Sequence, residues 1–267
     1  MTTIVFLHIP KTAGQTIHHQ LARAVGPRHV SPIRTHTQAL GQSQLPPGYL
    51  LHSGHIDWPD LESLPEDRFV FTVLRDPRER IASFYFYLLK EAQAASAQAL
   101  EEPEGVNKRT ILSRSADDYF FGGDAGWQAF VLDLYDNFYC SYFATRRMRG
   151  RGRLAGLEPQ DVLSRARAGL ALLDGIYWTD NLAALERDIH ARAGLRIQVV
   201  GRMRNAGSVP LDQPRWPLLM QRFETDAARS AMERFVERDL ALLADVPHPA
   251  PEPPRRGWRQ VLFRNSR

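Results

Sequence analysis

The stretch HIPKTAGQT (residues 8–16) contains the residue types of an anion-binding loop. It separates a β-branched apolar run, TIVFLHI, from QTIHHQLARAV, where Ile17 and Leu21 recur at helical spacing. A loop that leads from a strand into a helix presents free N–H groups at the positive end of the helix dipole. Gly14 lets the backbone approach closely, and Lys11 adds a mobile cation. We therefore expect a phosphate or sulfate site; an ordinary turn with an exposed lysine is the alternative.

A second basic motif, RDPRER, follows the apolar run RFVFTVL. This run is typical of a buried strand, so Arg75 should stand at its carboxyl end. Asp76 suits a helix N-cap, Pro77 suits the first helical position, and Glu79 would complete a capping box. The sequence IASFYFYLLKEAQAASAQAL then predicts a long helix, with Ser83 about two turns inside it. An ion pair with Glu79 is the structural alternative for Arg75.

A third polar stretch, HSGHID, follows a short strand predicted over residues 49–51. Ligands bind at the carboxyl ends of parallel strands, so the three polar stretches should meet at one site. The ordinary pKa of histidine suits a general base, which makes His55 a candidate and His52 a possible helper. Both could instead be structural. A zinc site is disfavoured because no cysteine or third histidine lies beside them.

Strands alternate with helices along the rest of the chain. GIYWT is typical of a strand, and helices are predicted over 117–147 (with a break at FGGDAG), QDVLSRARAGLALL, 180–194 and 217–246. We expect a polar loop over 101–115 and a short strand over 197–200. This pattern predicts an α/β protein: a three-layer α/β/α fold with a central parallel sheet, P-loop-like and nucleotide-binding, with additional helices.

The composition indicates one globular domain over 1–246 and a Pro-rich, basic tail over 247–267. In the tail, Trp258 and Phe263 interleave with arginines, so weak contact with a membrane surface is an alternative to a disordered or packed tail. No apolar run of about 20 residues and no secretory signal is evident. The one cysteine, Cys140, excludes an internal disulfide and suits a reducing cytosol.

The net charge of +4 comes mainly from arginine. Arginine favours planar anions, and a small anionic ligand explains this charge without a nucleic-acid partner, for which no motif is present. We expect Cys140 to be a packed thiol. An arginine-rich, alanine-rich and lysine-poor composition indicates a cytoplasmic, bacterial protein; it leaves the oligomeric state open.

Taken together, FLHIPKTAGQT and VLRDPRERIASFY resemble the PAPS-dependent carbohydrate sulfotransferases, especially the group that includes heparan sulfate 2-O-sulfotransferase. PAPS is 3'-phosphoadenosine 5'-phosphosulfate. The resemblance covers roughly the first third of the chain. It implies that Arg75 and Ser83 bind the 3'-phosphate. It also implies that the first motif holds the 5'-phosphosulfate through Lys11, Thr12, Ala13, Gly14, Gln15 and Thr16.

The same resemblance implies sulfuryl transfer to a hydroxyl acceptor, a glycan or glycolipid, with no metal. Lys11 would stabilise the leaving group, His55 would be the base, and His52 would bind substrate. DNFYCSYFA is similar to an acceptor-binding stretch and keeps Asn137, with Tyr139 and Tyr142 where relatives have Gln and Arg. GRMRNAGS resembles a late basic loop that closes over the nucleotide, which implies binding by Arg202 and Arg204.

Two other functions remain open. A magnesium-dependent nucleoside-triphosphate kinase with a degenerate P-loop would use Asp76 as its metal ligand. Against it, the loop lacks Gly-Lys-Ser/Thr, and Pro77 makes Asp76 a natural helix cap. A non-catalytic nucleotide- or glycan-binding protein on the same fold is the second alternative.

Overall fold

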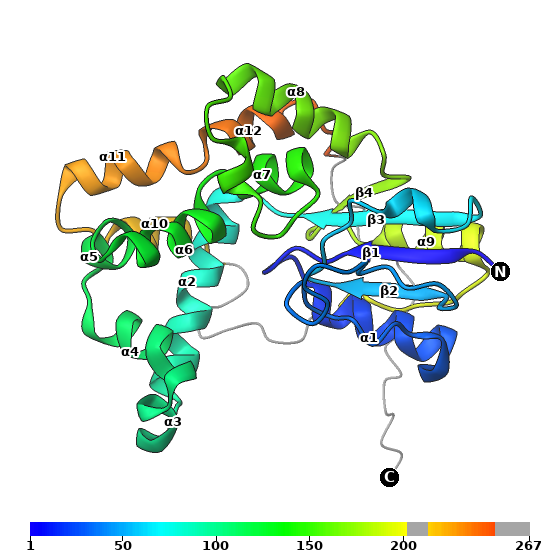
Figure 1. Cartoon of the computed structure of the whole chain (residues 1–267), viewed down its shortest axis with the longest axis horizontal. Helices are drawn as coiled ribbons and strands as arrows, with labels where there is room; N and C mark the ends of the chain where they lie inside the picture. Colours follow the sequence, from blue (N-terminus) through cyan, green and yellow to red (C-terminus); the bar gives the residue numbers. More distant parts are fainter. Residues whose placement is uncertain (202–212, 249–267) are drawn as a thin grey trace, which may run out of the picture.

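The computed structural model describes residues 1–201 and 213–248 and is built around a four-stranded parallel sheet (Figure 1). The order across the sheet is β2-β1-β3-β4. The strands are β1 (Thr3–Leu7), β2 (Leu51–Gly54), β3 (Arg68–Leu74) and β4 (Gly175–Trp178). Three of them lie where the apolar runs predicted strands. β2 begins later than expected and covers the first polar residues of HSGHID.

Helices cover both faces of this sheet. Alternate residues of a strand point to opposite faces, so Ile4 of β1 shares a buried cluster with Leu21, whereas Val5 shares another with Phe143. On one face lie α1 (Gly14–Val25) and α9 (Ala183–Ala193). On the other lie α7 (Phe138–Thr145), α8 (Pro159–Leu170) and α12 (Glu237–Leu243). Figure 1 shows α1 and α7 on opposite sides, which confirms the predicted three-layer α/β/α fold.

A second group of helices stands beside the sheet. β3 leads into α2 (Pro77–Gln93), which connects the two parts of the molecule (Figure 1). Tyr85, Phe120, Tyr135 and Phe223 belong to a separate buried cluster in this group. The remaining helices are α3 (Ala97–Glu101), α4 (Val106–Ser113), α5 (Ala116–Phe121), α6 (Ala125–Tyr135), α10 (Trp216–Met220) and α11 (Asp226–Arg234). Short 3₁₀ turns lie at η1 (Pro27–His29), η2 (Leu61–Ser63), η3 (Pro103–Gly105) and η4 (Arg151–Leu154).

Three local predictions are wrong. Residues 101–115 are mostly helical rather than a loop, because Ile111 of α4 is buried with the cluster around α2. The long helix after Asp76 ends at Gln93, and Ser96 caps a new helix by accepting the Ala99 N–H. Residues 197–200 form no strand, because the Glu186 carboxylate accepts the N–H groups of Val199 and Val200 at 2.6 and 2.9 Å.

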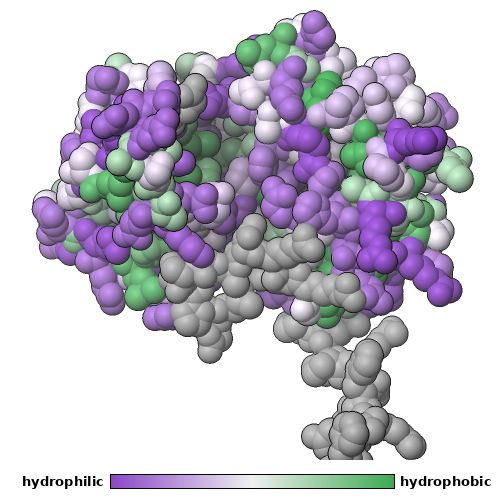
Figure 2. Space-filling view, turned by 90° about the horizontal axis from the view of Figure 1, so that it is seen from below, coloured by the Kyte–Doolittle hydropathy of each residue, from purple (hydrophilic) through white to green (hydrophobic). Residues whose placement is uncertain are grey.

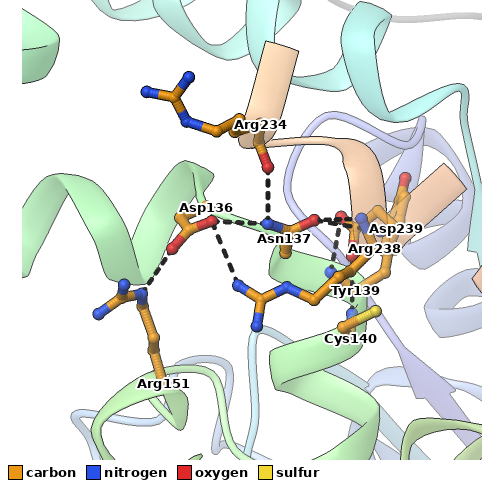
Figure 3. A network of polar contacts seen from close by, with 8 residues as sticks. All are labelled: Asp136, Asn137, Tyr139, Cys140, Arg151, Arg234, Arg238 and Asp239. Carbon is orange, nitrogen blue, oxygen red and sulfur yellow. Dashed lines mark hydrogen bonds and ion pairs between the residues drawn. The ribbon is translucent and has the colours of Figure 1, made fainter. Parts of the chain in front are cut away.

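A buried polar network ties α7 to α12 (Figure 3). The Asp239 carboxylate accepts the N–H groups of Tyr139 and Cys140 at the start of α7. The Asn137 side chain accepts from the Arg238 N–H at 2.7 Å and donates to the Arg234 carbonyl at 3.0 Å. Cys140 is fully buried, as expected of a packed thiol, and burial raises the pKa of its thiol.

The surface is largely polar. Figure 2 shows one face on which hydrophilic residues dominate and apolar residues form scattered patches. No helix within 1–201 and 213–248 has the length and apolar character needed to cross a membrane. At the end of the described chain, Trp178 donates its indole N–H to the Pro247 carbonyl, and His248 stacks on the same ring. The tail residues proposed for membrane contact lie outside the described residues.

Candidate active site

The three polar stretches meet in one cavity of about 810 Å³ at the carboxyl edge of the sheet. Its lining includes Lys11 after β1, His55 after β2 and Arg75 after β3. Ser83 lines the same cavity from α2. Parallel strands end at a common edge, which is why motifs more than 60 residues apart become neighbours here.

The loop between β1 and α1 has an unusual backbone. Lys11 and Ala13 both adopt the left-handed conformation, with φ of 73° and 63°. Such conformations cost of order 1 kcal/mol or more and cluster at functional sites. The Thr12 hydroxyl donates to the Ile9 carbonyl at 2.9 Å, and this hydrogen bond holds the loop in its conformation. A Cβ at Gly14 would overlap the His8 ring, so the loop requires glycine where α1 begins.

The predicted loop residues divide into two groups. Lys11, Ala13, Gly14 and Gln15 line the cavity. Gly14 and Gln15 also begin α1, and the first N–H groups of a helix have no partner within it. Thr12 and Thr16 are buried, and neither is among the residues that line the cavity. Thr12 therefore supports the loop, and the loop groups that an anion in the cavity could meet are the helix N-terminus and the lysine.

Three cations converge on this loop. Lys11, Arg75 and Arg215 all line the cavity. The pKa of Lys11 is lowered to about 8, first by burial and then by the charges of Arg75 and Arg215. The Lys11 ammonium lies 3.8 Å from the centre of the Tyr87 ring, a cation–π contact. Neighbouring like charges destabilise one another, and a multivalent anion between them would remove that repulsion.

Glu79 holds the arginines of the site together. Its carboxylate accepts from the Arg75 guanidinium at 3.1 Å and from the backbone N–H groups of Arg215 and Trp216 at 2.7 and 2.9 Å. Asp76 is the N-cap of α2, as predicted, and accepts the Glu79 N–H. The Glu79 side chain does not complete the predicted capping box, because it turns toward Arg75 and the 215–216 backbone.

Two tyrosines of α7 brace the strand ends that carry Arg75 and His55. The Tyr139 hydroxyl accepts the Arg75 N–H at 3.1 Å and donates to the Arg75 carbonyl at 2.9 Å. The Tyr142 hydroxyl donates to the Ile56 carbonyl at 3.0 Å. Both tyrosines are fully buried. They hold the backbone at these strand ends and are not among the residues that line the cavity.

His55 is held in one tautomer. Its Nδ1 lies 2.7 Å from the His8 carbonyl, which can only accept a hydrogen bond. Nδ1 therefore carries the proton, and Nε2 of the neutral ring keeps a free lone pair. Burial lowers the pKa of His55, so the ring is neutral near pH 7. Gly54 permits the close approach of the Arg34 backbone, whose carbonyl accepts the His55 N–H at 2.8 Å.

Besides Thr12 and Thr16, four predicted residues are not placed in the cavity. His52 is buried in β2, and both of its ring nitrogens lack a hydrogen-bond partner among the described residues. Asn137 belongs to the network of Figure 3, where it supports α7. Arg202 and Arg204 lie outside the described residues. Within the described ranges, no group of three or more His, Cys, Asp or Glu side chains is arranged to hold a metal ion.

Some residues that line the cavity were not predicted from the sequence. His8 lines the cavity with its ring centre 4.2 Å from that of His55, and His36 lines it beside them. The position of His8 at the head of the loop is a usable signal. Nothing local marks Arg215, because its neighbour in space, Glu79, is far away in sequence.

We predict that Glu79→Ala destabilises the fold by about 1–3 kcal/mol, because it leaves Arg75 and two backbone N–H groups without their acceptor. Glu233→Ala is the matched control. Glu233 pairs with Arg78, which lies on the same helix as Glu79, but the Glu233 side chain is 43% exposed against 21% for Glu79. We expect this variant to lose about 0–1 kcal/mol of stability. Urea unfolding measures both, and amide exchange at Arg215 and Trp216 should accelerate only in the Glu79 variant. Equal losses would contradict the anchoring role.

The comparison with known proteins agrees with this arrangement. Residues 2–138, just over half of the 267-residue chain, match the model of the sulfotransferase family. The matched range includes the loop after β1, His55, Arg75 and Ser83. A search of curated proteins finds no match. With more than half of its length matched, the chain belongs to the sulfotransferase family.

Proposed function

We propose that this protein transfers a sulfuryl group from PAPS to the hydroxyl of an acceptor, a carbohydrate by resemblance. Sulfotransferases generally use this donor. The observation that carries the proposal is the convergence of Lys11, Arg75 and Arg215 with the start of α1. The same cavity holds a neutral histidine, His55, whose Nε2 has no hydrogen-bond partner within residues 1–201 and 213–248. The first group suits a multivalent anion, and the second suits removal of a hydroxyl proton.

In this proposal the donor occupies the cationic part of the cavity. The N–H groups of Gly14 and Gln15 and the Lys11 ammonium bind the 5'-phosphosulfate. Arg75 and Ser83 bind the 3'-phosphate, with charge-assisted hydrogen bonds from the guanidinium. Arg215 adds a third cation that the sequence motifs do not include. Glu79 neutralises part of this charge before a nucleotide enters and holds Arg75 in place.

When bound, PAPS supplies a sulfuryl group on an oxygen that leaves with the nucleotide phosphate. His55 Nε2 accepts the proton of the acceptor hydroxyl as the new O–S bond forms, a role that contributes typically 10²–10⁴-fold in rate. Lys11 neutralises the charge that develops on the bridging oxygen as the old S–O bond breaks. The fixed loop and the Nδ1 hydrogen bond of His55 keep these groups in place.

The alternatives are less well supported. A kinase would need the Asp76 carboxylate for magnesium, but that carboxylate accepts the Glu79 N–H as the cap of α2. A non-catalytic nucleotide- or glycan-binding protein would have no use for a neutral histidine whose Nδ1 proton is fixed by the His8 carbonyl and which lines the same cavity as an anion site. Transfer activity separates these functions, since only a sulfotransferase moves label from PAPS.

The first test is calorimetric titration with PAP, the product nucleotide, against ADP and ATP with and without magnesium. We expect metal-independent micromolar binding of PAP and much weaker binding of ADP, because only PAP offers a 3'-phosphate to Arg75. Arg75→Ala should weaken PAP far more than ADP. Magnesium-dependent ATP binding with no preference for PAP would refute the sulfotransferase proposal, and equal losses for both nucleotides would make Arg75 purely structural.

The pH dependence of PAP binding should follow the protonation of the Lys11 side chain. The free protein holds the pKa of Lys11 at about 8, and a bound anion favours the charged form. Affinity should therefore be flat below pH 8 and fall by up to roughly tenfold per pH unit above it, where binding requires proton uptake. Lys11→Arg stays charged and should show no such decline. The same slope in both proteins would exclude Lys11 as its source.

His55→Ala should separate chemistry from donor binding. The affinity for PAP should stay within about twofold, while turnover of labelled PAPS falls by about 10²–10⁴-fold, the usual contribution of a general base. His19→Ala is the control, since His19 is an exposed histidine on α1. Undiminished turnover in the His55 variant would show that another group removes the proton.

A further inference from the structure

Helix α2 presents a row of three side chains to the cavity. Glu79, Ser83 and Tyr87 are spaced four residues apart, so they lie one above the other on the same face of the helix, and all three line the cavity. Glu79, in the first turn, pairs with Arg75 at 3.1 Å. Tyr87, about two turns further on, contacts Lys11. The row therefore gives the cation after β3 and the cation after β1 partners of different chemistry.

The contact between Lys11 and Tyr87 is close. The ammonium nitrogen lies 3.8 Å from the centre of the ring, well inside the roughly 6 Å over which a cation and an aromatic face attract one another. Glu91, one turn beyond Tyr87 on α2, raises the pKa of Lys11 through its charge and without a hydrogen bond. Among the described residues, the ring is therefore the direct partner of this cation.

An aromatic partner affects a cation differently from a carboxylate. A carboxylate neutralises the cation beside it, as Glu79 partly does for Arg75. The face of an aromatic ring attracts a cation through its quadrupole and adds no net negative charge. Burial raises the pKa of Tyr87, so its hydroxyl stays protonated and the ring stays uncharged near pH 7. Lys11 therefore keeps its full positive charge for an anion that enters the cavity.

Most of the groups around Lys11 disfavour its charge. Burial lowers its pKa most, and the charges of Arg75 and Arg215 lower it further, to about 8, whereas the charge of Glu91 raises it. His8, which follows β1, is kept neutral near pH 7 because burial lowers its own pKa well below the usual range. The ring face is thus the contacting group that favours the charged form of the lysine, against burial and two arginines.

We propose that Tyr87 is a positioning residue for Lys11. Its ring face holds the ammonium at the wall of the cavity in the charged form, where an anion at the start of α1 would meet it. Because this role needs only the face of the ring, phenylalanine should replace the tyrosine and leucine should not. The further step, that Lys11 held in this way neutralises the leaving oxygen, rests on the proposed function; the contact between ring and ammonium does not.

Lysine NMR tests the contact without any ligand. The chain has three lysines, Lys11, Lys90 and Lys108, so the ε-methylene signals are few, and Lys11→Arg identifies the signal of Lys11. We expect the Lys11 protons, which lie near the ring face, to resonate upfield and to titrate at about pH 8. Tyr87→Leu should abolish the upfield shift and lower the pKa of Lys11 by about 0.5, because the charged form loses its partner. Tyr87→Phe should preserve both properties.

Turnover of labelled PAPS tests the consequence for the reaction. Tyr87→Leu should lower kcat by about threefold to tenfold and change the affinity for PAP less, whereas Tyr87→Phe should stay within about twofold of the natural protein. Phe86→Leu is the matched control. Phe86 precedes Tyr87 on α2, but its ring lies 5.5 Å from the guanidinium carbon of Arg222, and it is not among the residues that line the cavity. This variant should leave the Lys11 signal and kcat unchanged.

Three results would overturn the inference. The first is an unchanged or raised pKa of Lys11 in Tyr87→Leu, since a ring that only excludes water would raise the pKa on removal. The second is an equal effect of Tyr87→Phe and Tyr87→Leu, and the third is an equal effect of Phe86→Leu. If the NMR differences appear but PAP does not bind, the proposed donor site fails while the positioning of Lys11 by Tyr87 is confirmed.

Discussion

The central constraint on this molecule is the repulsion among Lys11, Arg75 and Arg215 in one partly buried cavity. Three cations at the edge of a sheet are unfavourable unless something holds them there. Glu79 does so with one carboxylate, which takes an arginine on one oxygen and two backbone N–H groups on the other. Burial is the larger cause of the lowered pKa of Lys11, and the charges of Arg75 and Arg215 come next. A multivalent anion that binds between these cations would relieve the second contribution.

The helices outside the sheet make this concentration of charge possible. A parallel sheet brings strand ends together but does not fix the loops beyond them. Here α7 supplies the support, since Tyr139 braces the backbone of Arg75 and Tyr142 braces the residue after His55. The start of α7 is in turn held by Asp239 of α12 (Figure 3). The network around Asn137 thus contributes to the site through positioning.

The sequence predicted those features that depend on residues close together in the chain. Apolar runs identified the strands, and loop chemistry identified Lys11, Arg75 and His55, because each follows directly from a strand that must end at the same edge. The Glu79 contact with residues 215–216, the packing of Ile111 and the place of His36 beside His55 depend on chain segments far apart in sequence. Asn137 shows the opposite limit: a motif match indicated a ligand contact, whereas the tertiary structure uses its amide to join two helices.

Burial lowers the pKa of both the histidines and the lysine that line the cavity. This keeps the rings of His8, His36 and His55 neutral and suited to hydroxyl groups. At Lys11, the pKa falls to about 8. An anion bound there favours the charged form of every group near it, so it raises the pKa of Lys11 and, less directly, that of His55. In the proposed function, donor binding would therefore complete the charge on Lys11, the proposed stabiliser of the leaving oxygen, and raise the basicity of His55, the proposed base. Both groups would then reach their working state together.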